Sequence, residues 1–394
     1  MKQKLLDILC CPQCKDALQP IPIAVEGDEV LEGILWCACG QWFPVMAGVP
    51  RMFVSAVRPD YGDFYRKNRS FFPAQLKESF ALEMDSRTIQ KKATQESFGY
   101  EWEQYNSYGW LGKGEPESGM EITEFAAVDL EQYWSHTCET FWRKTLFARE
   151  ELKGKKVLDV GVGNGRYAQV ALESGAEVIG IDLSHAAEVA FRNTGGRVQT
   201  IQCDVFNLPF RDASFDCIYS IGVLHHSPDT RGAFTSLLPL LTGEGLVSIH
   251  LYKKGNFIYE MIDRTLRGIT TRLSLRTLWS LCAFPTLLGK ALYCNRHLFS
   301  FANSLAVLRT QHHFNFDWYS APVAFHHTEP EVEGWYREAG LTQVVSDDPT
   351  RNPDSYCAKI YPGYLKTPKG TVRKPVVALI PNWSLTVRGR RQAG

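Results

Sequence analysis

The amino-acid sequence predicts an α/β fold, in which a buried, mostly parallel sheet carries helices on both faces, with a helical insert and a small N-terminal zinc ribbon. From residue 155 onward, hydrophobic strand-like runs alternate with helical patterns. These runs are bounded by glycine and aspartate, which is typical of parallel strands covered on both faces. Five of the eleven cysteines lie within the first 39 residues, which indicates a metal site.

Length and composition limit the possible classes of protein. A chain of 394 residues predicts about two to three domains. Hydrophobic residues make up 44% and charged residues 22%, which excludes wholesale disorder. The 43 basic and 43 acidic residues give a net charge of zero, so the whole chain is not a general polyanion binder. No apolar run reaches the roughly 18 residues that a membrane span needs.

The N-terminus and the cysteine count indicate a cellular compartment. Asp7 interrupts the short apolar stretch that follows Met1, and cysteines stand where a signal peptide would be cleaved. We therefore interpret the start as mature protein and not as a secretion signal. An odd number of cysteines argues against a disulfide framework. We expect a cytoplasmic protein with reduced cysteines.

The chain divides into four expected parts. Residues 1–54 form the zinc ribbon, and 55–135 form a linker followed by an aromatic-rich helical lid segment. Residues 136–361 form the α/β domain, with a helical insert at 253–310. Residues 362–394 hold seven basic residues and no acidic one, which predicts a loose or surface-bound tail.

The α/β domain contains a regular series of expected elements. Strands are expected at Lys156–Val160, Glu177–Ile181, Val198–Ile201, Phe215–Ser220 and Leu246–Leu251, with helices at Gly165–Ser174, Ala186–Asn193 and Thr230–Leu241. After the insert, a helix is expected at Glu331–Ala339 and strands at Gln343–Val345 and Tyr356–Tyr361.

The strongest functional signal is the glycine-rich turn after the first strand of this domain. Asp159 ends the strand, and Gly161, Gly163 and Gly165 follow at alternate positions before a helix. Glycines allow the backbone to turn sharply and to approach a ligand closely. A dinucleotide-binding loop would have its third glycine at Arg166. An acidic residue beside the loop suits the ammonium group of a methionine moiety, so the motif favours S-adenosylmethionine over NAD.

Carboxylates also follow the next two strands. Asp182 ends the second strand, where it can accept hydrogen bonds from ribose hydroxyls of either cofactor. Asp204 follows the third strand, where it can accept from an adenine amine. Because ligands bind at the carboxyl ends of strands in open α/β sheets, these side chains are expected to share one site.

Residues 155–251, and 326–361 more loosely, resemble class I S-adenosylmethionine-dependent methyltransferases, with the closest similarity to the small-molecule, ubiquinone/menaquinone-type branch. The matching stretches are VLDVGVGNGRYA, VIGIDLS, DVFNLPF, FDCIYSIGVLHH and LLTGEGLVSI. The resemblance implies a Rossmann-like sheet of seven strands. It assigns the methionine end to Asp159, Gly161, Gly163 and Gly165, the ribose to Asp182 and the adenine to Asp204, with further cofactor contacts from Asn164, Leu183, Val205, Ser220 and Ile221.

Two close cysteine pairs predict a structural zinc site. Cys11 and Cys14 are separated by two residues, and Cys37 and Cys39 by one. Four thiolates satisfy the tetrahedral coordination of Zn²⁺ and leave no open position for catalysis. The surrounding stretch resembles the zinc ribbon of the small protein that activates several RNA and protein methyltransferases in trans. Such a ribbon could dock on the catalytic domain, recruit substrate or mediate self-association.

Two histidines and three aromatic residues are candidates for the methyl-transfer site. His225 and His226 follow the fourth strand, where either could act as a base or a substrate anchor, with His225 preferred. A structural role for both is the alternative. Tyr100 and Trp102 could close over the cofactor, and Tyr167 could face its methionine end, although core packing explains all three equally well.

The insert at 253–310 suggests the kind of acceptor. It contains nine basic residues against Glu260 and Asp263, as well as an apolar run at 278–288. This composition suits an acidic, lipid-like or aromatic acceptor, or a peripheral membrane contact, and a solvated basic face is the plain alternative.

We therefore expect transfer of a methyl group from S-adenosylmethionine to an oxygen or carbon of a small molecule. In this hypothesis no nucleic acid is bound stably, and homo-oligomers are possible. One alternative is a macromolecular (RNA or protein) methyltransferase that uses the ribbon for recruitment. The other is a non-enzymatic S-adenosylmethionine-binding scaffold.

Overall fold

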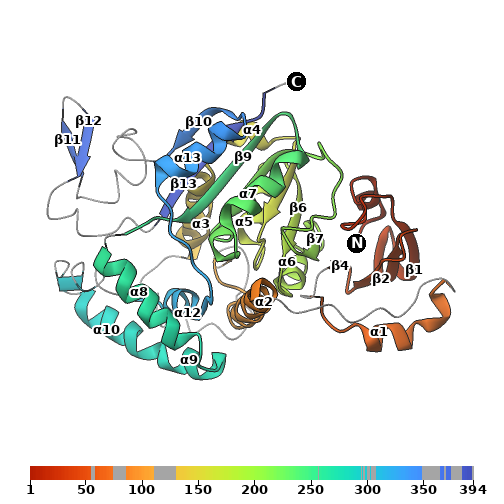
Figure 1. Ribbon diagram of the computed structural model, residues 1–394, viewed down its shortest axis with the longest axis horizontal. Helices are drawn as coiled ribbons and strands as arrows, with labels where there is room; N and C mark the ends of the chain where they lie inside the picture. Colours follow the sequence, from red (N-terminus) through yellow and green to blue (C-terminus); the bar gives the residue numbers. More distant parts are fainter. Residues whose placement is uncertain are drawn as a thin grey trace.

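The elements of the fold come from a computed structural model, which describes residues 1–54, 58–73, 86–110, 130–255, 257–293, 295, 298–299, 302, 308–347, 364–367, 370–373 and 384–392 (Figure 1). The strands are β1 (Gln19–Glu26), β2 (Glu29–Trp36), β3 (Trp42–Met46), β4 (Val49–Met52), β5 (Lys156–Val160), β6 (Glu177–Asp182), β7 (Gln199–Cys203), β8 (Phe215–Ile221), β9 (Leu241–Tyr252), β10 (Thr342–Ser346), β11 (Tyr364–Thr367), β12 (Gly370–Arg373) and β13 (Ser384–Arg390). The helices are α1 (Gly62–Lys67), α2 (Ser86–Gln104), α3 (Leu130–Thr145), α4 (Arg149–Leu152), α5 (Arg166–Glu173), α6 (Ala186–Asn193), α7 (Thr230–Leu237), α8 (Phe257–Thr270), α9 (Leu275–Leu281), α10 (Ala283–Tyr293), α12 (His312–Ser320) and α13 (Glu329–Glu338), with short 3₁₀ turns η1 (Gln3–Asp7), η2 (Arg69–Phe71), η4 (Leu224–His226) and η5 (Leu238–Leu240).

A large mixed sheet runs through the described part of the chain in the order β1-β2-β3-β4-β7-β6-β5-β8-β9-β13-β10. Strands β4 to β9 of this series pair in parallel, whereas β13 pairs antiparallel with both β9 and β10. The seven strands from β7 to β10 form the expected Rossmann-like sheet, so the predicted fold class is confirmed.

The core alternates across the sheet as strand geometry requires. Leu158 and Ile179 belong to one buried cluster, whereas their neighbours Val157 and Val178 belong to another. Successive side chains of a strand point to opposite faces, so the two clusters lie on the two faces of the sheet. Residues of α7 and α13 cover the first face, and residues of α3, α5 and α6 cover the second.

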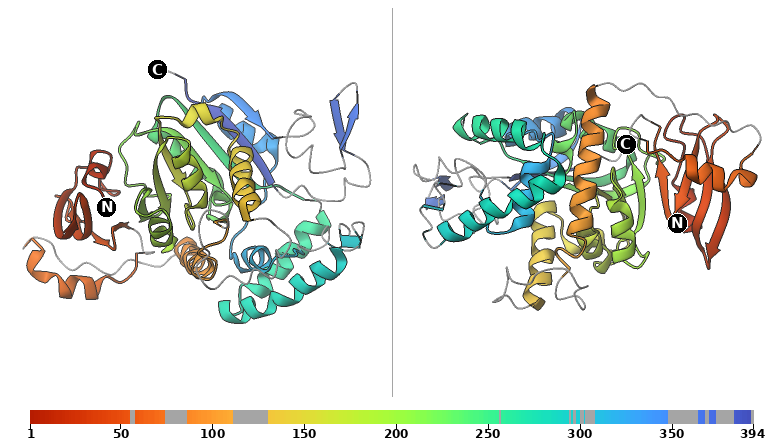
Figure 2. Two further views of the ribbon diagram at one scale, coloured as in Figure 1. Left: turned by 180° about the vertical axis from the view of Figure 1, so that it is seen from behind. Right: turned by 90° about the horizontal axis from the view of Figure 1, so that it is seen from below.

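The N-terminal unit is joined to the catalytic sheet as an extra edge. Strand β4 pairs in parallel with β7, with Arg51 opposite Gln202 and Met52 opposite Cys203. Both views in Figure 2 place β1 and β2 at this end of the molecule. Of the three roles that the sequence left open for the ribbon, docking on the catalytic domain is therefore observed.

The C-terminal tail contains a strand that the sequence reasoning missed. Residues 362–394 were expected to be loose or surface-bound, but Ser384–Arg390 forms β13 inside the main sheet. Leu385 and Val387 are buried in the core, and Arg388 forms an ion pair with Glu151 at 2.8 Å. The number of basic residues alone did not indicate that apolar side chains of this segment are buried and that its polar side chains are paired.

Helix α2 joins the linker to the aromatic-rich part of the segment 55–135, because its charged and aromatic residues lie on one continuous helix, Ser86–Gln104. The strand expected at Tyr356–Tyr361 lies outside the described residues. The helical insert is present as α8, α9 and α10, which extend away from the sheet in Figure 1.

Helix α12 connects the insert to the rest of the molecule. The Arg267 guanidinium of α8 donates to the carbonyl oxygens of Trp318 at 2.7 Å and Ala321 at 2.9 Å. On the opposite side, Ser97 of α2 donates to the carbonyl oxygen of Ser320. None of the helices in the described ranges combines the length and the apolar character that crossing a bilayer would require.

Candidate active site

The glycine-rich turn has a backbone shape that explains its glycines. Gly161, Gly163 and Gly165 all have positive φ, at 84°, 52° and 86°. A Cβ at Gly161 would lie 2.2 Å from a methyl carbon of Val223, and a Cβ at Gly163 would lie 3.0 Å from the Trp102 ring. Because glycine has no side chain, the backbone of the turn approaches Val223 and Trp102 more closely than any larger residue would allow. This narrow cradle at a helix start fits the methionine end of S-adenosylmethionine.

Asp182 connects this turn to the end of β6. One carboxylate oxygen accepts from the Gly163 backbone N–H at 3.0 Å, and the other accepts from the N–H and the hydroxyl of Ser184, both at 2.8 Å. Burial raises the pKa of Asp182, while these hydrogen bonds oppose the increase. The carboxylate is thus held at the position where ribose hydroxyls would be expected.

Asp204 follows β7 and contacts the helix above it. Its carboxylate accepts from the Lys91 ammonium of α2 at 2.6 Å and from the backbone N–H of Phe206 at 3.0 Å. Lys91 also lies 4.4 Å from the centre of the Phe206 ring. Helix α2 is therefore attached to the end of β7 by a charged contact.

A cavity of about 220 Å³ connects these features across the carboxyl ends of the strands. The predicted cofactor residues on its wall are Gly161, Asp182, Leu183, Asp204, Val205 and Ile221. Helix α2 contributes Lys91, Thr94, Gln95, Phe98, Glu101 and Trp102. In the described residues, therefore, the lid segment covers the site, and Trp102 is one of the residues that does so.

Other predicted cofactor residues lie behind this wall. Asp159 is buried and accepts from the Tyr219 hydroxyl at 2.8 Å, and burial raises its pKa to about 7. Ser220 donates to the carbonyl oxygen of Val160 at 3.0 Å. Gly163, Asn164 and Gly165 form the turn without lining the cavity. The Asn164 amide donates to the carbonyl oxygen of Tyr108 at 2.7 Å, which connects the turn to the segment after α2.

The two histidines after β8 occupy different positions. His226 lines the cavity, and its Nδ1 lies 2.6 Å from the carbonyl oxygen of Val323. His225 packs against the Tyr252 ring at 3.9 Å, outside the cavity wall. Burial lowers the pKa of both, to about 3 for His226. The geometry therefore favours His226 over His225 for a contact with substrate, the opposite of the preference from sequence.

Sequence reasoning missed many of the polar side chains on the cavity wall. The polar residues there are Glu101, Lys144, Arg166, His250, His313 and Asp317, and Tyr167 lies among them, where the sequence allowed it. They come from α2, α3, α5, β9 and α12, which only the folded chain brings together. No local spacing connects these residues, so no motif could have identified them.

Glu101 and His313 form a buried contact on this wall. Glu101 Oε1 lies 2.9 Å from His313 Nε2, and both side chains are almost inaccessible to solvent. Burial raises the pKa of Glu101 to about 8 and lowers that of His313 to about 3. Both groups therefore favour their uncharged forms. The contact joins α2 to α12.

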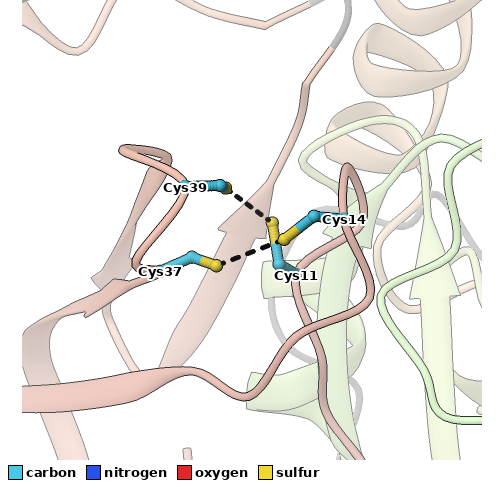
Figure 3. A group of neighbouring side chains, drawn as sticks. All are labelled: Cys11, Cys14, Cys37 and Cys39. Atoms are coloured by element: carbon cyan, nitrogen blue, oxygen red, sulfur yellow. Dashed lines mark hydrogen bonds between the residues drawn. The ribbon is translucent and has the colours of Figure 1, made fainter.

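The four predicted zinc ligands lie together in the N-terminal unit (Figure 3). The sulfur atoms of Cys11, Cys14, Cys37 and Cys39 are all within 4.8 Å of one another. Cys11 and Cys14 follow η1, whereas Cys37 and Cys39 follow β2, so two loops present two thiols each. This donor set fits a closed tetrahedral Zn²⁺ site. Cys10, although it is adjacent to Cys11 in the sequence, is not part of the cluster.

The N-terminal unit also contacts the loop that carries part of the cavity wall. The backbone N–H of Cys10 donates to the carbonyl oxygen of Pro209 at 2.9 Å, and the Lys15 ammonium donates to that of Leu208 at 2.7 Å. These contacts are only a few residues from Asp204 in sequence. The unit is therefore physically connected to the part of the cavity wall that contains Asp204.

Comparison with known families identifies two domains. Residues 158–249 match the family described as a methyltransferase domain, and residues 2–48 match the family described as Trm112p-like protein. The chain contains a methyltransferase domain and a Trm112p-like domain. The methyltransferase domain takes S-adenosylmethionine as its cofactor, as predicted, and the Trm112p-like cysteine cluster could bind zinc.

Two similar proteins act on tRNA according to their names. The chain is 38% identical over 95 residues to "Probable tRNA methyltransferase 9B" of Homo sapiens, covering 24% of this chain and 20% of that protein. It is 29% identical over 201 residues to "tRNA (carboxymethyluridine(34)-5-O)-methyltransferase alkbh8" of Xenopus tropicalis, covering 48% of this chain and 29% of that protein. The similarity thus spans less than a third of either relative. A relative named for a small molecule, "Phosphoethanolamine N-methyltransferase 2" of Caenorhabditis elegans, is 39% identical over 108 residues, covering 26% of this chain and 25% of that protein.

Among solved structures, the complex of the Haloferax volcanii Trm112 methyltransferase activator with a methyltransferase is similar at 16% identity. It covers 66% of this chain and 93% of that one, with a TM-score of 0.36.

These comparisons correct two expectations. The predicted small-molecule acceptor, and with it the small-molecule branch, is contradicted by relatives that are named as tRNA methyltransferases. The expectation that no nucleic acid is bound is contradicted by the same names. The stretches on which the resemblance rested contain the residues predicted to bind the cofactor, and such residues carry no information about the acceptor.

Proposed function

We propose that the protein is an S-adenosylmethionine-dependent methyltransferase that modifies tRNA. The observation that carries this proposal is the similarity of its methyltransferase domain to tRNA methyltransferases, in a chain that also contains a Trm112p-like domain. The reaction is an in-line displacement, in which the acceptor atom forms a bond to the methyl carbon. The bond from that carbon to the sulfonium breaks, and its electron pair stays on sulfur. The protein contributes alignment and exclusion of water.

The geometry supports specific roles for the cofactor residues. We assign the methionine end to the turn at Gly161, the ribose to Asp182 and the adenine to Asp204. Helix α2 would close over the bound cofactor, because Lys91 and Trp102 already lie on the cavity wall. His226, on the same wall, would contact the acceptor or the transferred methyl group. The cofactor itself supplies the activated methyl group.

We assign a supporting role in cis to the zinc ribbon. Zinc held by the four cysteines would fold a unit too small to maintain a core of its own. That unit then holds the strand and loop around Asp204 through β4 and Lys15.

Incubation of the zinc-loaded full-length protein with methyl-labelled S-adenosylmethionine and separated cellular fractions tests the function. The fractions are tRNA, ribosomal RNA, proteins and small metabolites, taken from cells that lack the enzyme. We expect label in tRNA, in one nucleoside after digestion, and strongly reduced label with the Asp182→Asn variant at a limiting concentration of S-adenosylmethionine. Label only in the protein or metabolite fraction would contradict the proposal.

A further inference from the structure

The cavity contains two charged side chains without a hydrogen-bonding or ion-pair partner among the described residues, although the Lys144 ammonium lies 6.0 Å from the centre of the Tyr167 ring. In the described part of the chain, neither Lys144 nor Asp317 makes a hydrogen bond or an ion pair. The other charged groups of the wall differ from them. Lys91 is paired with Asp204, and Asp182 is bonded to backbone and hydroxyl donors. Because a charge facing a partly closed cavity is costly unless it is paired, these two side chains indicate a ligand that supplies the partners.

Their position is on the side of the cavity away from the adenosine residues. Asp182 and Asp204 follow β6 and β7, whereas the sheet continues on the other side of β5 through β8 to β9. His250 and Tyr252 of β9 line the cavity together with Lys144 and Asp317. A cofactor that extends from β7 to the glycine turn after β5 would present its methyl group toward this side.

The electrostatics connect the two side chains to one another. Burial raises the pKa of Asp317 to about 7, and Lys144 is one of the groups that oppose the increase. Burial also lowers the pKa of Lys144, while Asp317 raises it. The charge of each group therefore affects the pKa of the other, although the two side chains make no hydrogen bond or ion pair with one another. A ligand between them can accept a hydrogen bond from the ammonium and donate one to the carboxylate.

Aromatic rings on the same wall suit a flat ligand. Tyr252 comes from β9, and Phe314 comes from α12 and is 39% exposed. Phe98 lies 4.9 Å from the His226 ring, and both line the cavity. Planar bases bind between such rings, and they are identified by hydrogen bonds to their edges.

We propose that Lys144 and Asp317 form the acceptor subsite, where they recognise a nucleobase that presents an N–H group next to a carbonyl oxygen. Lys144 donates to the carbonyl, and Asp317 accepts from the N–H. Uracil and guanine have such an edge, whereas cytosine and adenine do not. This inference rests on the proposed action on RNA. The rival occupant is the methionine end of the cofactor, whose carboxylate and ammonium would also complement a lysine and an aspartate.

Nucleoside binding tests the subsite separately from RNA methylation. The probes are uridine, cytidine and 3-methyluridine, titrated into the zinc-loaded full-length protein saturated with S-adenosylhomocysteine. We expect uridine to bind at least about 10-fold more tightly than cytidine or 3-methyluridine. Those two nucleosides lack the N–H group that would donate a hydrogen bond to Asp317. Equal binding of uridine and 3-methyluridine, or no binding of uridine, would overturn the proposal.

Substitutions decide between the nucleobase and the methionine end of the cofactor. Asp317→Asn and Lys144→Met are expected to weaken uridine binding at least about 10-fold while the dissociation constant of S-adenosylhomocysteine changes less than about threefold. The matched controls are the exposed residues Asp212→Asn and Lys153→Met, which should change neither. Loss of cofactor affinity with both cavity variants would assign the two side chains to methionine and overturn the proposal.

These experiments distinguish a failure of the proposed tRNA methylation from a failure of the proposed acceptor subsite. If RNA is not methylated but uridine binds selectively and depends on Lys144 and Asp317, the proposed function fails and the subsite stands. If RNA is methylated but uridine binding does not depend on them, the subsite fails. Should either variant not fold, as judged by its melting curve, the comparison of uridine with 3-methyluridine on the unmodified protein still decides.

Discussion

The residues of the cysteine cluster lie close together in the sequence, whereas the residues of the cofactor cavity come from distant parts of the chain. The cluster takes all four thiols from two loops of the first 39 residues. The cavity takes its wall from α2, α3, α5, α12 and the ends of five strands. A metal site can be specified by local spacing, because a single ion imposes the geometry. A cavity for an extended ligand depends on the packing of distant helices. The cysteine cluster is therefore sensitive to the loss of a single cysteine. The cavity is sensitive to the loss of contacts between helices and strands.

The largest expected effect of a single change is at the cysteine cluster. Cys14→Ser removes one of four thiols, and structural zinc in small domains supplies about 10 kcal/mol or more of folding free energy. We expect loss of stoichiometric zinc and unfolding of residues 1–54, measured by metal analysis and by limited proteolysis.

Cys138→Ser is the matched control, because Cys138 lies outside the cluster. It should retain zinc and resist proteolysis like the unmodified protein. A Cys14→Ser protein with full zinc content and normal proteolytic resistance would show that the cluster is not a zinc site.

The next effect is expected where the two regions meet. Arg51 of β4 is 3% exposed, donates to the Gln202 side chain at 2.6 Å and forms an ion pair with Glu188. Arg51→Met would leave both partners without their donor, so we expect a loss of about 3 kcal/mol in the free energy of unfolding. Chemical denaturation measures this loss.

The same variant is expected to bind S-adenosylhomocysteine several-fold more weakly, because β7 leads into Asp204. Unchanged stability together with unchanged affinity would mean that the two regions are independent.

A smaller effect, with a defined pH dependence, is expected at Glu101. Its pKa in the folded protein is raised by burial to about 8, above the ordinary value of 4.5. Below pH 4.5 the group is protonated in both states. As the pH increases toward 8, the unfolded chain ionises first, so the native state loses stability over this window.

Glu101→Gln removes that loss. We expect the variant to gain about 2 kcal/mol relative to the unmodified protein between pH 5 and pH 6.5, measured by denaturation at both values. Asp159 is present in both proteins, and Glu101 is not among the groups that shift its pKa, so its titration cancels. A stability difference that is the same at both pH values would contradict the buried, uncharged state of Glu101.

The smallest effect is expected at the surface between the regions. Lys4 and Glu177 form an ion pair at 2.8 Å, and their side chains are 59% and 47% exposed. Solvent screens such a pair, so Lys4→Ala should change the free energy of unfolding by less than about 0.5 kcal/mol. A loss as large as that of Arg51→Met would show that exposed contacts, and not the β4–β7 junction, hold the domains together.

The sequence identified the parts of the site that follow one another along the chain. The turn at Gly161, the carboxylates Asp182 and Asp204, and the cysteine pairs each have a local pattern with a physical cause. Lys144 and Asp317 have no such pattern, because their significance arises only when α3 and α12 meet across the cavity. Strand β13 was missed for a related reason, since the basic residues that suggested a loose tail find partners in distant elements. Motifs that predict a cofactor site could not identify the methyl acceptor.

The most direct test of the account is a calorimetric titration of S-adenosylhomocysteine and NAD into the zinc-loaded full-length protein and its Asp182→Asn variant. We predict one molecule of S-adenosylhomocysteine bound per chain, no binding of NAD, and an affinity about 30-fold lower in the variant, because a charged acceptor of several hydrogen bonds is lost. The control Asp212→Asn should bind like the unmodified protein. Absence of S-adenosylhomocysteine binding, equal binding of NAD, or an unchanged affinity with Asp182→Asn would contradict the assignment of the cavity.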